Sequence, residues 1–217
     1  DAGDAMYRAA VVAEVQLAHL DDQDQDRDDD DQKRRDDKRR AAAAKVEEEL
    51  TKFGDEASAY YVRALQDDDK PCLHTRLTKS LLIANRPGDA VPTATRALAR
   101  LKETKANDKL VFNALELLAD TYALTDRFLD AVDVLEQATG LLGDTKLAWP
   151  SRAQDAARTA NALATARERT GSFDIARDLW LDCARQYRLL EDEDSAKHAN
   201  DRANQLASAI RHRDDDD

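Results

Sequence analysis

Residues 112–143 read FNALELLADTYALTDRFLDAVDVLEQATGLLG and contain the clearest pattern in the chain. Apolar residues recur every three or four positions on both sides of a short polar break at residues 125–127. Residues three and four apart share one face of an α-helix, so this period indicates two amphipathic helices. The stretch therefore predicts a helical hairpin with a tight turn.

The two predicted helices carry apolar residues of complementary size. These residues are Leu115, Leu118, Ala119 and Tyr122 in the first helix, and Ala131, Leu135 and Ala138 in the second. The small Ala119 allows the second helix to come close, while the larger side chains fill the space around it. Close packing of the two helices is therefore the physical reason for the spacing.

Three further stretches are in register with this hairpin. Ala160, Leu163, Ala164, Gly171, Ala176, Trp180 and Cys183 repeat the pattern 45 residues later, and Leu81, Leu82, Ala94, Leu98 and Leu101 repeat it 37 residues earlier. In the first and weakest stretch, Ala57, Tyr61 and Ala64 fit a second helix, whereas residues 41–50 fit a first helix poorly. Residues 173–189 either close one hairpin or open the next, because every helix of a solenoid packs on both neighbours.

This order of residues resembles the tetratricopeptide repeat (TPR) signature over residues 41–211. The resemblance implies an all-α fold, a right-handed superhelical array of helical hairpins, or α-solenoid. The spacings of 37 and 45 exceed the regular repeat of about 34 residues. They imply longer helices or loops, as in kinesin light chain-like repeats or the soluble NSF attachment proteins.

Two N-terminal segments and a short tail complete the predicted domain organisation. Residues 1–20 are predicted to form an amphipathic helix through Met6, Ala9, Ala10, Ala13, Leu17 and Leu20. This helix either packs on the repeat array or docks on a partner. Residues 21–40 contain ten Asp, seven Lys or Arg and no apolar residue, which predicts a flexible linker, or else an acidic arm for a basic partner. Residues 212–217 are predicted to form an acidic tail, with the same alternative.

Charge and composition restrict the classes of partner. The 217 residues carry a formal net charge of −12, and no basic stripe with interleaved aromatic residues is present. Nucleic acid is therefore an unexpected partner. Cys72 and Cys183 are far apart in the sequence, which indicates reduced thiols.

The sequence also carries signals about location. No apolar run approaches 18 residues and no signal peptide is recognisable, so no membrane insertion is expected. We expect a soluble intracellular protein, either cytoplasmic or in an organelle after removal of a transit peptide. Because the chain begins at Asp1, it is expected to be a fragment or a mature form.

No catalytic motif is recognisable in the sequence. It has no phosphate-binding loop, HExxH, CxxC or nucleophile elbow, so no catalytic or cofactor-binding residue is predicted. The pair Asp194 and His198 lies beside other acidic residues, but a solvated helix start explains it better than a metal site. We assign no metal.

The resemblance to tetratricopeptide repeats implies a partner-binding groove lined by the first helix of each hairpin. By register, the groove residues are Arg76, Lys79 and Arg86, then Asn113, Glu116 and Asp120, then Arg158, Asn161 and Thr165. This succession of basic, acidic and polar residues suits an extended or helical peptide of mixed charge. Ordinary solvated helix faces are the alternative interpretation.

A carboxylate clamp for chaperone C-termini, present in some relatives, can be tested by register. Lys79 and Arg158 match two of its positions, but Ile83, Leu117 and Ala162 occupy the others, which argues against it. The leading hypothesis is a non-catalytic scaffold or adaptor within a larger protein assembly. The alternatives are a vesicle-fusion adaptor like the soluble NSF attachment proteins, or an enzyme without a recognisable motif.

Overall fold

The computed structural model describes residues 29–144 and 149–216, and the side chains within 39–144 and 149–211. All regular secondary structure in this part of the chain is α-helical, as predicted. The helices are α2 (Asp29–Asp67), α3 (Pro71–Ile83), α4 (Pro87–Glu103), α5 (Asp108–Ala123), α6 (Phe128–Gly143), α7 (Arg152–Arg169), α8 (Phe173–Leu189) and α9 (Glu193–Asp216).

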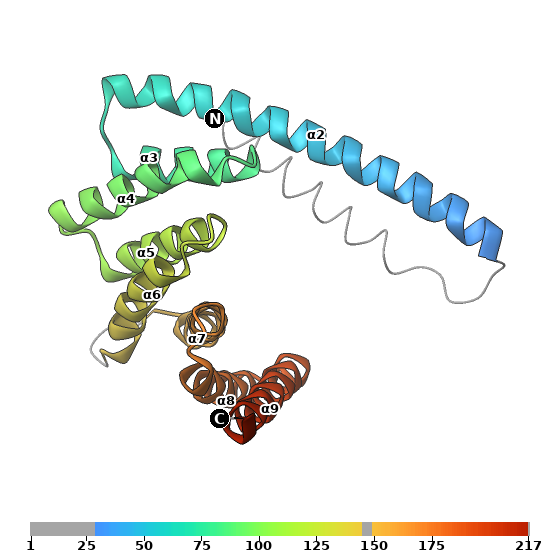
Figure 1. Cartoon of the computed structure of the whole chain (residues 1–217). Helices are drawn as coiled ribbons and strands as arrows, with labels where there is room; N and C mark the ends of the chain where they lie inside the picture. The colour runs from blue at the N-terminus through green and yellow to red at the C-terminus, as the bar shows by residue number, and fades with distance from the viewer. Residues whose placement is uncertain (1–28, 145–148, 217) are drawn as a thin grey trace. The chain divides into compact units, whose positions relative to one another are not determined.

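The helices fall into two compact units, residues 1–97 and residues 98–217. In the first unit α2 packs on α3, and α3 contacts the first part of α4 through a hydrogen bond between Thr78 and Thr93. In the second unit α5 packs on α6, α6 on α7, α7 on α8 and α8 on α9 (Figure 1). Sequential packing of this kind produces hairpins, because each helix reverses direction and returns along its predecessor.

Five of the connections between helices use the same turn. Each is closed by a backbone hydrogen bond from an N–H to the carbonyl five residues earlier, in the pairs Arg86–Leu81, Ala106–Leu101, Arg127–Tyr122, Ser172–Arg167 and Asp192–Tyr187. A residue with positive φ precedes the donor each time, namely Asn85, Lys105, Asp126, Gly171 or Glu191. This geometry is a Schellman turn, which ends a helix abruptly. The turns predicted at residues 125–127 and at Gly171 are thereby confirmed.

The connection between α6 and α7 differs from these five. It runs from Asp144 to Ser151, and residues 145–148 lie outside the described part of the chain. The extra residues account for the spacing of 45 between the hairpin of α5 and α6 and the hairpin of α7 and α8. This spacing was predicted to reflect longer helices or loops.

The core of the second unit is rich in alanine. The buried cluster contains Ala160, Ala164, Ala176, Trp180, Cys183, Ala184, Ala199, Ala203 and Leu206. Small residues on facing helices let the backbones approach, and the large indole of Trp180 fills the remaining space. The thiol of Cys183 is buried here, and burial raises its pKa to about 11. Cys72 is exposed, and both cysteines are free, which agrees with the predicted reduced thiols.

Helices α2 and α9 correct three predictions. Residues 41–50 and 57–64, predicted as the two helices of a first hairpin, belong to one continuous helix of 39 residues. The linker predicted at residues 21–40 is helical from residue 29 onward, while residues 21–28, like the predicted N-terminal helix at 1–20, lie outside the described residues. At the other end, α9 continues to Asp216, so the predicted acidic tail begins inside a helix.

The sequence contains a reason for the helical state of residues 29–40. An acidic residue precedes a basic one by four positions in the pairs Asp29–Lys33, Asp30–Arg34, Asp31–Arg35 and Asp36–Arg40. Pairs with this spacing and order stabilise a helix by about 0.2–0.5 kcal/mol each. The absence of apolar residues indicates that the segment lacks a core of its own, but it does not prevent a helix.

Gly54 lies in the middle of α2, where it serves packing and not a turn. This glycine is buried within the helix, and a Cβ atom placed on it would lie 2.5 Å from the backbone nitrogen of Ala84 and 2.8 Å from the carbonyl oxygen of Ser80. Its role is therefore close contact between α2 and the end of α3. Ala57 and Tyr61 continue this contact against Leu77 and Leu81 of α3.

We predict that Gly54→Ala destabilises the protein. Alanine favours a helix by about 1 kcal/mol over glycine. The added methyl group, however, meets backbone atoms, and overpacking of this kind costs about 1–3 kcal/mol or more. Thermal unfolding should therefore show a lower melting temperature for Gly54→Ala. In the control Gly88→Ala nothing lies within 4 Å of the new Cβ, and a similar loss there would contradict the steric explanation.

A second prediction concerns the turn between α7 and α8. Gly171 has φ of +77° and open space around its Cβ position, so substitution affects the backbone conformation alone. Gly171→Ala should cost about 1–2 kcal/mol in the free energy of unfolding, because an L-residue is strained in the left-handed region. Gly140→Ala, at an open position within α6, should leave the stability equal or higher in chemical denaturation.

Candidate functional site

The first helices of successive hairpins, α5, α7 and α9, are linked to one another by ion pairs in the second unit. Arg158 of α7 binds Glu116 of α5 through two hydrogen bonds of 3.1 and 2.7 Å. Glu168 of α7 accepts hydrogen bonds from Arg202 of α9, one of them 3.0 Å long. Polar side chains therefore bridge the three helices on this side, and the alanine-rich core packs α7 and α9 on α8.

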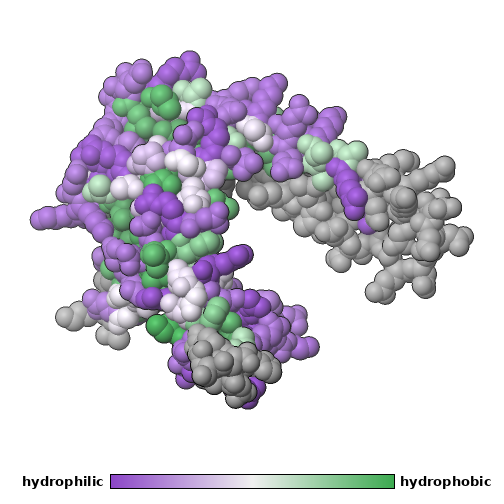
Figure 2. All heavy atoms as spheres, in the orientation of Figure 1, coloured by the Kyte–Doolittle hydropathy of each residue, from purple (hydrophilic) through white to green (hydrophobic). Residues whose placement is uncertain are grey.

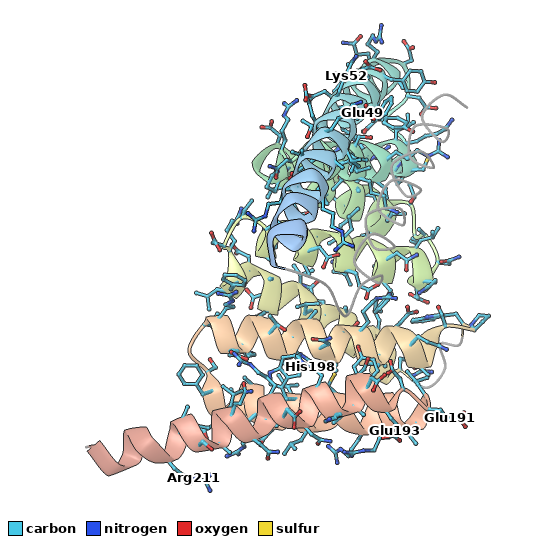
Figure 3. The ribbon with its side chains drawn as sticks, turned by 90° about the vertical axis from the view of Figure 1, so that its right-hand side faces the viewer. Glu49, Lys52, Glu191, Glu193, His198 and Arg211 are labelled. Carbon is cyan, nitrogen blue, oxygen red and sulfur yellow. The ribbon has the colours of Figure 1, made fainter. Side chains whose placement is uncertain are left out.

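A hollow of about 640 Å³ lies between α7 and α9. We call it the α7–α9 hollow, and its lining residues are Asn161, Thr165, Glu168, Arg169, Trp180, His198, Asp201, Arg202 and Gln205. Its walls are polar and carry charges of both signs. Figure 3 shows His198 on the side of α9 that faces α7.

An aromatic pair and an ion pair are built into the hollow. The ring of His198 meets the indole of Trp180 edge to face, with 6.1 Å between the ring centroids. The Trp180 Nε1 atom donates a hydrogen bond of 3.4 Å to Glu168, which also binds Arg202. These contacts among the lining side chains give the hollow a defined shape in the protein without a ligand.

Two of the predicted groove residues line the hollow. The Asn161 side-chain amide donates a hydrogen bond of 3.5 Å to the Tyr187 hydroxyl, and Thr165 is exposed one turn further along α7. The predicted residue Arg158 lies on the same helix, nearer its start, in the ion pair with Glu116. The structure thus places three predicted residues of α7 on the side that bears the hollow and the ion pair.

The predicted residues of α5 lie beside Arg158. Asn113 and Asp120 are exposed, and Glu116 is half-buried beneath the Arg158 guanidinium. Desolvation by the surrounding protein, together with repulsion from Glu116, raises the pKa of Asp120, and Arg158 partly opposes the shift. The Asp120 carboxyl group is therefore in contact with solvent and partly desolvated at the same time, as expected for a residue in a recessed part of the surface.

The predicted groove residues of the first unit lie on α3 and in the turn that follows it. Arg76 is half-buried and Lys79 exposed, both on α3. Arg86 lies beyond the end of α3, where it pairs with Asp89 of α4 and with Asp55 of α2. This residue holds the turn between α3 and α4 to α2. A common groove containing all nine residues stays a prediction.

Helix α9 contributes one wall of the hollow, although no groove residue was predicted on it. His198, Asp201, Arg202 and Gln205 come from this helix. The sequence does contain a signal for this helix. The pattern of a first helix is matched by Trp180, Cys183, Ala184 and Tyr187, which predicts a second helix after them. The turn at Glu191 also repeats the turn at Gly171, 20 residues earlier. Extending the register by one helix would have identified this wall.

Asp155 anchors the start of α7 to α5. Its carboxylate is 2% exposed and accepts hydrogen bonds from Lys109, from Trp149 Nε1 at 2.6 Å, from Ser151 at 2.9 Å and from Arg158 at 2.8 Å. The Trp149 ring in turn lies 5.6 Å from the Phe112 ring of α5. These contacts fix α7 beside α5 across the long connection after α6, and they position Arg158.

Asp155 carries a pH-dependent contribution to stability. Desolvation opposes the charged form, but the hydrogen bonds from Lys109, Trp149 and Ser151 outweigh it and lower the pKa of Asp155. A lowered pKa stabilises the fold above the unfolded-state value of about 3.9, and the contribution is lost as the pH falls through the folded-state value.

We predict that Asp155→Asn lowers the free energy of unfolding by about 2–4 kcal/mol at pH 7, because it removes the charge from a buried cluster of donors. The difference between Asp155→Asn and the unmodified chain should shrink below about pH 4, where the unfolded-state carboxylate becomes protonated, and it should be lost as the pH falls through the lower folded-state pKa of Asp155. Chemical denaturation between about pH 3 and pH 7 measures both effects. A constant difference across that range would show that the charge of Asp155 is not responsible.

The described residues contain no further chemical site of a recognised kind. Among their side chains, no three His, Cys, Asp or Glu residues lie close enough together to hold a metal ion. None of the helices in 29–144 and 149–216 is both long and apolar enough to cross a membrane.

Comparison with known proteins gives structural matches only. No protein-family model matches the chain, and no curated protein matches its sequence. A variant of the nearly identical TPR-like repeats from Podosopora anserina, assigned to a kinesin light chain, superposes with a TM-score of 0.60 at 17% identity, covering 80% of this chain and 84% of that one. A second structure of these repeats has a TM-score of 0.51 at 16% identity, with 79% and 92% covered. The chain therefore has the fold of TPR-like helical repeats.

Proposed function

We propose that the protein is a non-catalytic scaffold or adaptor, a subunit of a larger assembly, and that a partner segment binds over α5, α7 and α9 of the second unit. The observation that supports this proposal is the α7–α9 hollow together with the ion-paired surface beside it. The fold supplies the general class, since TPR-like repeats bind other proteins. The site supplies the chemistry of the contact.

Mixed charge defines the partner that fits this surface. Arg169 and Arg202 provide positive charge, Asp120 and Asp201 provide negative charge, and amide groups stand at Asn161 and Gln205. Side-chain amides both donate and accept hydrogen bonds, so they can pair with a peptide main chain. An extended or helical segment with charges of both signs therefore complements the surface better than a uniformly charged polymer.

The hollow favours a single inserted side chain. Trp180 is 4% exposed and forms its floor, and the imidazole of His198 offers an aromatic face on the α9 wall. Hot spots of protein interfaces are commonly anchor side chains that enter such preformed pockets. Figure 2 shows that hydrophilic residues cover most of the visible face of the molecule, as expected for recognition through polar contacts.

Affinity purification with mass spectrometry tests the proposal. The double variant Thr165→Arg, Asp201→Arg places two bulky cations in the hollow without breaking an ion pair described above. A partner recovered with the unmodified chain should fall by about tenfold or more, as expected when an interface loses at least about 1.4 kcal/mol. Circular dichroism checks that the variant is folded.

A matched control comes from α6, which belongs to the second-helix side. Asp133→Arg, Thr139→Arg makes the same chemical change at two exposed positions. Recovery of the partner should be retained in this control. Equal loss in both variants would indicate a nonspecific charge effect, and loss in neither would place the contact outside the hollow. The substitution Lys79→Glu tests separately whether α3 of the first unit contributes.

A further inference from the structure

Helix α2 carries an apolar stripe that α3 does not cover in full. The stripe consists of Ala43, Val46, Leu50, Phe53, Ala57, Tyr60 and Ala64, spaced alternately by three and four residues. This is the heptad spacing by which one helix packs against another along its length. We call these seven residues the α2 heptad stripe.

Most of the α2 heptad stripe remains accessible. Ala57 is buried, but Tyr60 is 43% exposed and the other five residues are half-buried. Helix α3 ends beside Gly54, so Ala43, Val46 and Leu50 belong to the part of α2 that continues past α3 (Figure 1). A stripe of this length on a single helix is stabilised when a second helix covers it, because neighbouring apolar side chains leave water together.

A second stretch of this chain has the same spacing. Met6, Ala10, Ala13, Leu17 and Leu20 are separated alternately by four and three residues, and they lie outside the described residues. Both stretches combine alanine with larger apolar residues at this spacing, as helices that pack along their length do.

The length of chain between the two stretches permits them to meet. Seventeen helical residues, as in 4–20, span about 25 Å, and residues 29–43 of α2 span about 21 Å. The eight residues from 21 to 28 reach at most about 26–29 Å. An antiparallel arrangement with Leu20 beside Ala43 and Met6 beside Ala57 is therefore within reach of the connection.

We propose that residues 4–20 dock as a helix on the α2 heptad stripe of the same chain. They would take the place of the first helix in the hairpin that α2 closes. The segment 41–50 was predicted for that place but forms part of α2 itself. This docking is separate from the proposed partner contact, which lies in the second unit, so either can fail without the other.

Hydrogen–deuterium exchange on the full chain tests this docking. Amides of residues 6–20 should exchange slowly in the unmodified, monomeric protein, and Leu50→Glu on α2 should accelerate their exchange by about tenfold or more. Leu17→Glu, which changes the other partner, should have the same effect while leaving the exchange of residues 54–65 of α2 unchanged. Val62→Glu makes a matched change at an exposed position of α2 outside the stripe and should have no effect.

Three outcomes would overturn the proposal. Fast exchange of residues 6–20 in the unmodified chain would show that the segment is not docked. Slow exchange that survives Leu50→Glu would place its contact elsewhere. Protection that appears only at concentrations where light scattering detects a dimer would identify a second copy of the chain as the occupant.

Discussion

The close approach of neighbouring helices is the constraint on which the rest of this structure depends. In the second unit, alanine residues of α7, α8 and α9 face one another, and in the first unit Gly54 of α2 accepts the backbone of Ala84 without room for a methyl group. Short side chains at the contacts allow each helix to pack on its neighbours in sequence. Five Schellman turns then return the chain within a few residues each time.

Ion pairs link the first helices of the second unit to one another. Apolar residues join α7 and α9 to α8, while the Glu116–Arg158 pair joins α5 to α7 and the Glu168–Arg202 pair joins α7 to α9. The arginine side chains of the Glu116–Arg158 and Glu168–Arg202 pairs are 58% and 40% exposed, so each pair contributes little to stability. They hold the surface in one arrangement, and that preorganisation is what a binding surface requires.

Asp155 connects the interior of the fold with that surface. Its buried carboxylate fastens α7 to α5, and the same carboxylate holds the guanidinium of Arg158 that reaches Glu116. A structural anchor and a surface charge thus share one residue. Damage to the anchor is expected to move Arg158 as well, so the stability of the second unit and the shape of the surface are coupled.

The helical hairpins could be predicted from the amino-acid pattern, because the three-to-four residue period and the small residues at fixed spacing require only local geometry. The sequence also identified the turns at residues 125–127 and at Gly171, where the polar or glycine residues permit a left-handed backbone. The sequence did not reveal that Gly54 serves a close helix contact, since the same residue type also breaks helices. It likewise did not reveal the helix at residues 29–40, where charged pairs replace the apolar pattern.

Which polar residues act together depends on contacts between distant parts of the chain. Arg86 has the positive charge that was expected of a groove residue. It lies past the end of α3, however, where the turn places it in ion pairs with Asp89 and Asp55. Arg202 meets Glu168 across 34 residues of sequence. The α7–α9 hollow likewise exists because α8 folds α9 back beside α7. Contacts of this range depend on the path of the whole hairpin, and a local period carries no information about them.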